Sequence, residues 1–543
     1  MKTDRREFLK YGLLTSSAFL GSIYTFHQRR SRSTEELNYT GELIDQSERG
    51  HQLRKAMAME PRGYEEVPVL IAGGGMSGLL TGYYLKTHGF NNFRIVEMND
   101  RIGGNSSYGE NAVSKYPWGA HYIPLPNMEN VELVTFLKDM GVAKAGGKNV
   151  EFSEEYLCQD PQERLFMRGE WQESILPSKN ITREDQDQLK RFHDLVEAYK
   201  YKKGRDGRFV FSIPVMLSSQ DPEHLALDRI SFDQFLKKNN FNSDVVHWYM
   251  NYCMLDDYGM GTDLVSAWAG LHYFCSRRPL GQYDDHRILT WPEGNGWVLQ
   301  RLEEILKNHI ASNQAVIDIH WQGPKRVASR IFDFQSRQMT ACQSHALIFS
   351  APQFLSQYLF KQKTDLPEVD ADDYYSWVVA NVTLKLPANE LNKLHWDNVR
   401  FGSKSLGYVH ARHQELRART DGTTVLTLYW PLYEKNHTAT EIRKKISGMS
   451  WQQWAQQVVS EFEFMHPGIS KHIRNVDVKV HGHAMMGPRI GRMQKVFTTR
   501  SRYQNKKGIF FSHTDNSGMS LFEEAHFWGH QTAREVLKYV GIS

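Results

Sequence analysis

The 543-residue sequence predicts an α/β fold, in which a parallel-sheet domain is assembled from separated stretches of chain and a mixed α/β domain is inserted into it. Near the N-terminus, residues 67–86 read as a short apolar strand, a glycine-rich turn and a helix. Near the C-terminus, residues 508–511 read as another strand, followed by a glycine-containing turn and a last helix. The long stretch between them carries most of the tryptophans and tyrosines and supplies the inserted domain.

Composition and charge exclude several function classes. Apolar residues make up 40% and charged residues 24%, near the average of globular proteins, so the chain is not largely disordered. The net charge of +4 comes from residues 1–33, because the rest of the chain is close to neutral. A nearly neutral chain after residue 33 gives no indication of a basic surface for binding nucleic acid. The four cysteines are widely spaced without a C-x-x-C pair, so we expect buried thiols and no metal site.

Residues 1–33 have the pattern of an export signal. Arg5-Arg6-Glu7-Phe8-Leu9-Lys10 precedes a mostly apolar stretch over residues 11–26. The pattern resembles a twin-arginine signal, although Asp4 holds the place of the usual Ser or Thr. An ordinary basic start before an apolar helix is the alternative. The resemblance implies that the twin-arginine machinery exports a folded, cofactor-loaded protein to the periplasm. The apolar stretch is short for a membrane span and no cleavage site is evident, so an uncleaved tether is a second possibility.

The glycine-rich turn has the spacing of a dinucleotide-binding site. After a polar stretch, residues 34–66, that predicts a linker, the turn matches G-x-G-x-x-G. We assign Gly73 to the tight turn, Gly75 to close approach of a pyrophosphate and Gly78 to helix packing. Met76 and Ser77 begin the helix, whose free N–H groups bind phosphate. A second strand, residues 93–96, ends at Glu97, where an acid grips a ribose.

Residues farther along indicate which dinucleotide is bound. Arg101-Ile102-Gly103-Gly104-Asn105 follows Glu97, and Trp118-Gly119-Ala120-His121 comes later. Here the chain resembles the flavin amine oxidase superfamily, which includes monoamine and polyamine oxidases and phytoene desaturases. The resemblance implies non-covalently bound FAD, with Gly103, Gly104, Gly119 and Ala120 close to it. Asn105 stands where the family often has an arginine for the pyrophosphate; an amide donates hydrogen bonds there but brings no charge.

The C-terminal segment extends this resemblance. Ser512-His513-Thr514-Asp515 follows the last strand, and Glu523-Glu524-Ala525 begins the last helix. The family implies that Asp515 contacts the ribityl chain or the pyrophosphate and that the helix N-terminus at Glu524 points at the flavin. The family has glycine where this chain has Glu524. A turn or helix-capping role is the alternative for Asp515.

These features divide the chain into seven segments. They are the signal at 1–33, the linker at 34–66, the Rossmann-like FAD-binding domain at 67–140, 286–354 and 501–543, and the mixed α/β substrate domain at 141–285 and 355–500. No internal repeat or low-complexity tract interrupts them.

Two catalytic features of the family are missing. Asn381 falls at the position of the family lysine near flavin N5, and Leu521 falls in the slot of an aromatic cage residue. His121 and His483 are the candidate acid, base or polar anchor, although each could equally be a packed structural histidine.

The resemblance implies an FAD-dependent oxidoreductase that moves a hydride from a C–N or C–C bond of a small organic substrate to flavin N5. O₂ or a membrane quinone is the expected acceptor, because NAD(P)H is not maintained outside the cytoplasm. A non-catalytic flavoprotein that relays electrons to a protein or membrane partner is the alternative.

Overall fold

The computed structural model describes residues 38–542, apart from 46, 147–148, 284–286, 364–365, 368, 416–420 and 504–506. The predicted signal at 1–33 lies outside these residues. The chain divides into a unit of residues 1–40 and a unit of residues 41–543, and only the second is treated below. No helix in the described part of the chain is long and apolar enough to cross a membrane.

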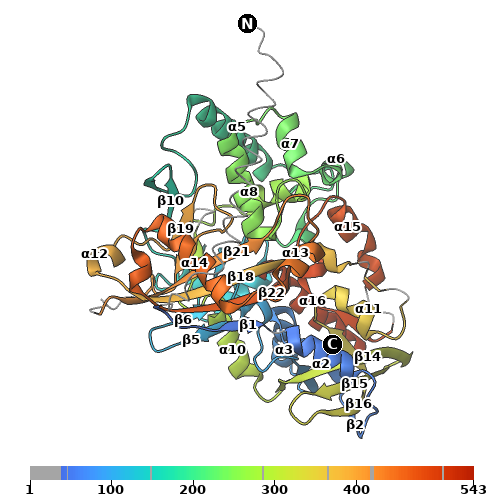
Figure 1. Cartoon of the computed structure of the whole chain (residues 1–543). Helices are drawn as coiled ribbons and strands as arrows, with labels where there is room; N and C mark the ends of the chain where they lie inside the picture. Colours follow the sequence, from blue (N-terminus) through green and yellow to red (C-terminus); the bar gives the residue numbers. More distant parts are fainter. Residues whose placement is uncertain are drawn as a thin grey trace, which may run out of the picture. The chain divides into compact units, whose positions relative to one another are not determined.

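A five-stranded parallel sheet draws its strands from three distant stretches of sequence. In this region the blue N-terminal and red C-terminal parts of the chain lie side by side (Figure 1). The strand order is β13 (Ile310–Ala311), β4 (Phe93–Val96), β3 (Val69–Ala72), β17 (Ala346–Phe349) and β23 (Ile509–Phe511). The central strands β3 and β17 are apolar along their whole length, because both faces of the sheet are covered. This sheet confirms the predicted α/β class and its discontinuous parallel domain.

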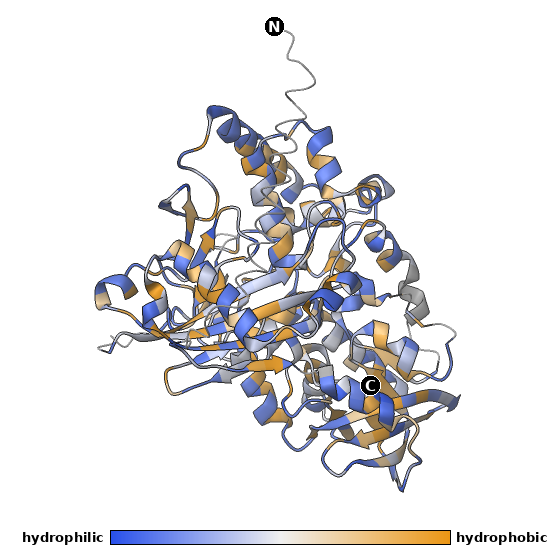
Figure 2. Ribbon diagram, viewed as in Figure 1, coloured by the Kyte–Doolittle hydropathy of each residue, from blue (hydrophilic) through white to orange (hydrophobic). Residues whose placement is uncertain are grey.

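Helices cover one face of this sheet and a second sheet covers the other. The helices α3 (Met76–Thr87), α10 (Gly296–Leu306) and α16 (Phe522–Val540) pack together on the first face. The second sheet is four-stranded, in the order β14 (Gln314–Gly323), β15 (Arg326–Asp333), β16 (Gln338–Ser344) and β2 (Gly63–Glu66). These strands carry both hydrophobic and hydrophilic residues (Figure 2), and hydrophobic side chains of β14, β15 and β16 pack on the parallel sheet.

The inserted domain contains an eight-stranded mixed sheet. Its order is β1 (Leu43–Asp45), β22 (Ile473–Met486), β18 (Tyr374–Lys385), β21 (Thr423–Leu432), β20 (Tyr408–His410), β19 (Asp397–Arg400), β10 (Glu163–Met167) and β11 (Glu170–Glu173). Strand β18 is buried along almost its whole length between β21 and β22. The longer helices of this domain are α5 (Arg183–Lys200), α7 (Phe232–Lys238), α8 (Asp244–Tyr258), α9 (Ala267–Cys275), α13 (Ala439–Ile446), α14 (Trp451–Met465) and α15 (Arg492–Tyr503).

Shorter elements connect these layers. They are α4 (Val131–Asp139), α6 (Pro222–Leu225), α11 (Ser356–Leu359), α12 (Ala388–Leu391) and the strand pairs β5 (Tyr108–Glu110) with β6 (Lys115–Pro117), β7 (Tyr122–Pro124) with β12 (Ile288–Thr290), and β8 (Ala143–Gly146) with β9 (Asn149–Phe152). The four cysteines Cys158, Cys253, Cys275 and Cys342 are buried free thiols.

The part of residues 34–66 from 41 onward is not a linker, contrary to the sequence-based prediction. It forms β1, the helix α2 (Ser47–Ala56) and β2. Strand β1 pairs in parallel with β22, and β2 pairs in parallel with β16. Both are short edge strands, of three residues in β1 and four mostly exposed residues in β2, so neither contains an apolar run long enough for the sequence pattern to reveal it.

Candidate active site

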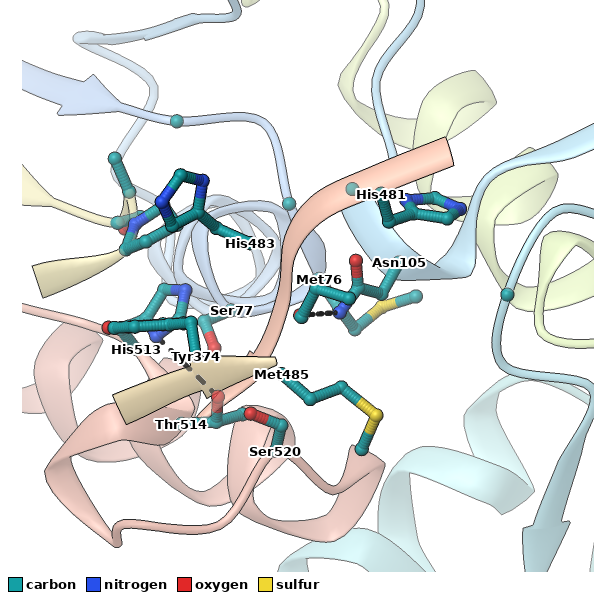
Figure 3. A pocket seen from close by; sticks show the side chains of 18 of the residues that line it. Met76, Ser77, Asn105, Tyr374, His481, His483, Met485, His513, Thr514 and Ser520 are labelled. Carbon is teal, nitrogen blue, oxygen red and sulfur yellow. Dashed lines mark hydrogen bonds between the residues drawn. The ribbon is translucent and has the colours of Figure 1, made fainter. Parts of the chain in front are cut away.

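A cavity of about 1060 Å³ is lined by residues of both the parallel-sheet domain and the eight-stranded sheet. Small-molecule pockets usually measure roughly 300 to 1000 Å³, so this cavity accommodates an extended ligand. Its wall includes the glycine turn and the start of α3, the end of β4, the segment after β23, and parts of β18, β21, β22, α8 and α16. Figure 3 shows the region where the N-terminus of α3, the end of β22 and the segment after β23 meet.

The glycine turn forms one end of the wall through Gly73, Gly75, Met76 and Ser77. A Cβ built on Gly75 has no described atom within 4 Å, so a side chain there would enter the cavity. By contrast, a Cβ on Gly78 would lie 2.1 Å from the carbonyl oxygen of Gly73. Position 78 therefore requires glycine for the helix to pack this closely. Among the described residues no side chain caps α3, so the N–H groups of its first turn are left for a ligand.

Glu97 stands beside this turn at the end of β4. Its carboxylate accepts hydrogen bonds from the backbone N–H of Gly74 at 2.8 Å and of Asn99 at 2.9 Å. Burial raises its pKa above the ordinary value. Gly103 and Gly104 line the cavity next to it, and the N–H of Gly103 donates to the carbonyl of Gly74 at 2.8 Å. The two glycine segments predicted to contact the cofactor therefore form one continuous surface.

Asn105, Gly119 and Ala120 are packed into one unit of the wall. The N–H of Ala120 donates to the carbonyl of Asn105 at 2.8 Å, and a Cβ on Gly119 would lie 2.2 Å from the same oxygen. The side-chain Nδ2 of Asn105 donates to the carbonyl of Ala484 on β22 at 2.6 Å (Figure 3). This amide therefore joins the two domains, whereas the sequence-based interpretation assigned it to the pyrophosphate.

Asp515, a predicted cofactor contact, turns away from the cavity. Its carboxylate accepts hydrogen bonds from the N–H of Gln353 at 2.9 Å and from the Tyr374 hydroxyl, and it pairs with His513 at 3.0 Å. The described wall includes its neighbours His513 and Thr514 instead. The sequence-based prediction placed Asp515 against the cofactor, but its side chain points into the protein.

Glu524, the other predicted contact at this end, is also outside the wall. It is fully buried, and it accepts hydrogen bonds from the N–H of Val215 at 2.7 Å and from the Ser517 hydroxyl. Burial raises its pKa to about 7. A glycine at this position would expose only its backbone to the cavity. The carboxyl group of Glu524 is buried instead, so it needs hydrogen-bond donors inside the protein.

His121 lies in the wall within an aromatic cluster. Its ring stacks on Tyr429 with centroids 4.4 Å apart and meets Tyr122 edge-on at 4.9 Å. Burial lowers its pKa to about 3, so the imidazole is neutral at pH 7. His121 is therefore suited to shaping the aromatic wall and is a poor proton donor at neutral pH.

His483 lies in the wall beside Tyr374 and His513 (Figure 3). Its ring stacks on Phe354 at 4.6 Å, and desolvation lowers its pKa to about 4. Asn381, at the position of the family lysine, is buried and not part of the described wall; its Nδ2 donates to the carbonyl of Pro117 at 3.1 Å. The residue at that position therefore carries no charge.

A group of charged residues at another part of the wall was missed by the sequence analysis. It consists of Asp256, Asp257, Arg277 and Glu523, and it is called the acidic floor below. Arg277 pairs with Glu523 at 3.0 Å. Asp257 is only 6% exposed, and its Oδ2 has no hydrogen-bond partner in the part of the chain that the structure describes. Three carboxyl groups thus share one guanidinium.

The acidic floor holds carboxyl groups that titrate near neutral pH. Burial, reinforced by the charges of Asp257 and Glu163, raises the pKa of Asp256 to about 8. Burial raises the pKa of Asp257 to about 6. Shifted carboxyl groups in a cavity are typical of catalytic or binding sites. Adjacent acids at the end of the aromatic-rich α8 are the sequence signal that could have revealed them.

Replacing His121 with phenylalanine tests the buried neutral imidazole. In the unfolded chain this histidine binds a proton once the pH falls below its ordinary pKa of 6.5. In the folded protein it stays neutral until the pH approaches its lowered pKa of about 3. Its contribution to stability is therefore lost as the pH falls through this window. We expect the melting temperature of His121→Phe, relative to the wild type, to rise as the pH is lowered from 7 toward 4, measured by calorimetry of the apoprotein. His437→Phe, at an exposed position outside the cavity, is the control. A constant difference for His121→Phe would contradict the assignment.

Comparison with known proteins identifies part of the chain. Residues 71–139 match the family described as an NAD(P)-binding Rossmann-like domain. This segment is therefore similar to Rossmann-like dinucleotide-binding domains. No curated protein sequence matches the chain.

Solved structures extend the likeness over most of the chain. Putrescine oxidase bound to putrescine has a TM-score of 0.60 and 13% identity, and the match covers 88% of this chain and 100% of that one. Cyclohexylamine oxidase from Brevibacterium oxydans has a TM-score of 0.59 and 13% identity, with the same coverage. A fatty acid isomerase from P. acnes has a TM-score of 0.58 and 15% identity, over 86% and 98%. These similarities show a shared two-domain fold.

Proposed function

We propose that the protein is an FAD-dependent oxidoreductase that holds its cofactor non-covalently and oxidises a small organic substrate. The observation that carries this proposal is one cavity with a dinucleotide cradle at the Rossmann-like unit and a separate acidic floor in its wall. Bound FAD would supply a hydride acceptor. The shared fold with two amine oxidases supports the same assignment.

Different residues of the cavity wall would bind different parts of the cofactor. The open space at Gly75 fits a pyrophosphate, which the free N–H groups at Met76 and Ser77 would bind. Glu97 would accept hydrogen bonds from ribose hydroxyls. Gly103, Gly104, Gly119 and Ala120 present backbone without side chains of any size to the rest of the cofactor.

The acidic floor indicates how a substrate is held. At pH 7 Asp256, whose pKa is raised to about 8, is mostly protonated, so among the described wall residues at this floor the carboxylates of Asp257 and Glu523 face one guanidinium, that of Arg277. A cationic group would relieve the remaining negative charge. We propose that the substrate is a protonated amine and that Asp257 pairs with it. With bound FAD supplying the hydride acceptor, a carboxylate of the floor would take the proton that the amine nitrogen loses. The charged groups of the acidic floor lie inside a cavity. This favours an enzyme that binds a substrate there over a non-catalytic electron relay, which needs no substrate cavity.

Anaerobic mixing of the purified protein with matched compounds tests the proposal. The protein is expected to be yellow, and primary alkylamines should bleach the flavin while the alcohols of the same carbon skeleton should not. The readout is the flavin absorbance before and after mixing. Bleaching only by a reduced quinone or a protein donor would instead establish the electron relay.

We further propose that the protein is exported folded by the twin-arginine machinery and that O₂ or a membrane quinone reoxidises it in the periplasm. Replacing both Arg5 and Arg6 with lysine should abolish export, which cell fractionation measures. The control replaces Arg29 and Arg30 with lysine, because this second basic pair lies after the apolar stretch. Export of the Arg5/Arg6 variant at the wild-type level would overturn the localisation.

A further inference from the structure

Residues 41–66 lie outside the predicted cofactor domain, yet they connect the two sheets whose residues line the cavity. At one end, β1 pairs with β22 at the edge of the eight-stranded sheet. At the other, β2 pairs with β16 in the four-stranded sheet. Between these anchors, Ala56 of α2 packs against Ile317 and Phe332. The helix is therefore held in place at both ends and along one face.

Helix α2 forms part of the cavity wall. Its lining residues are Gly50, His51, Leu53 and Arg54, and Met57 directly after the helix also lines the wall. The guanidinium of Arg49 donates to the carbonyl of Met98 at 2.6 Å and to Oδ1 of Asn313 at 2.9 Å. These bonds fasten α2 to the loop that follows Glu97 and to the segment before β14. The helix thus lies at the same end of the cavity as the acid assigned to the ribose.

Arg54 is a cation of this helix that lines the cavity and has no partner among the described residues. Three arginines line the described wall, and two of them have partners: Arg277 pairs with Glu523, and Arg443 donates to the carbonyl of Tyr374 at 2.8 Å. Arg54 is exposed, and no group in the described ranges accepts a hydrogen bond from it. Asn105 brings no charge to the glycine turn, so the wall at this end is short of positive charge for a diphosphate.

We propose that α2 is a strap that closes over the AMP half of the bound cofactor, with Arg54 presenting its guanidinium to an oxygen of that half. This inference rests on the proposed function, because it takes FAD as the ligand. A guanidinium suits phosphate and ribose oxygens, and the β1 and β2 anchors keep the helix from swinging away. The strap slows release of the cofactor.

The holoprotein tests this strap through flavin release. We expect Arg54→Ala to release FAD about tenfold faster than the wild type, since a charge-assisted hydrogen bond is lost. Arg54→Glu should release it faster still. Binding of FMN, which lacks the AMP half, should be the same in all three proteins. The readout is the rise of free-flavin fluorescence after dilution, and Lys55→Ala is the control, because Lys55 is exposed on the same helix but outside the described wall.

The outcomes separate this inference from the proposed function. A yellow wild type whose Arg54 variants release FAD at the wild-type rate overturns the strap and leaves the proposed function intact. Equal weakening of FAD and FMN binding by Arg54→Ala also overturns it. A wild type that binds neither flavin overturns the proposed function and the strap together. The exposed position of Arg54 keeps folding unaffected, which the melting temperature of the apoproteins verifies.

Discussion

Replacing Gly75 with valine is expected to abolish flavin binding while the protein still folds. The space beside Gly75 is free of described protein atoms, and its backbone φ of −73° is open to any residue, so the new side chain meets no protein. The side chain instead occupies the space that we assign to the pyrophosphate. The measurement is the ratio of flavin to protein absorbance after purification, together with the melting temperature of the apoprotein.

Gly482→Val is the matched control for this prediction. Gly482 lies on β22, outside the described wall, and a Cβ built there also has no described atom within 4 Å. This variant should load flavin as the wild type does. Full flavin content in Gly75→Val would show that the turn does not hold the cofactor, and a colourless Gly482→Val would show that the assay reports general damage.

Replacing Asp257 with asparagine should lower the rate of flavin reduction by an alkylamine by about 100-fold, because a buried ammonium loses its charged partner. Its Oδ2 has no other described partner to compensate. Stopped-flow reduction under anaerobic conditions at several amine concentrations gives the rate and the dissociation constant. Flavin content should be unchanged, because Asp257 lies in the acidic floor and not in the glycine turn.

Asp244→Asn provides the control on the same helix. Asp244 is exposed in the first turn of α8, outside the described cavity wall. It should reduce its flavin at the wild-type rate, with at most a small loss of stability from the helix dipole. Unchanged reduction in Asp257→Asn would remove Asp257 from the proposed site. Loss of flavin in the same variant would point to a structural role.

The dinucleotide-binding unit was predictable because its signal is local. Strand β3, the glycine turn, α3, β4 and Glu97 follow one another within a short stretch, and each depends on its own residue types and spacing. The turn needs a left-handed Gly73 and a close helix approach at Gly78, and both requirements are readable from the sequence. The α/β class followed from the same pattern, repeated in part at the C-terminal end.

The direction in which individual side chains point could be determined only from the tertiary structure. Asp515 and Thr514 are neighbours in sequence, but only Thr514 lies in the described wall, because a turn sends successive side chains in different directions. The edge strands β1 and β2 are stabilised by distant partner strands and not by their own composition. The acidic floor joins α8, the segment after α9 and the start of α16, and the pKa of Asp257 depends on the burial that this packing creates. Local pattern therefore determined where a cofactor can bind, whereas long-range packing decided which charged groups share its cavity, since contact and desolvation exist only after the chain has folded.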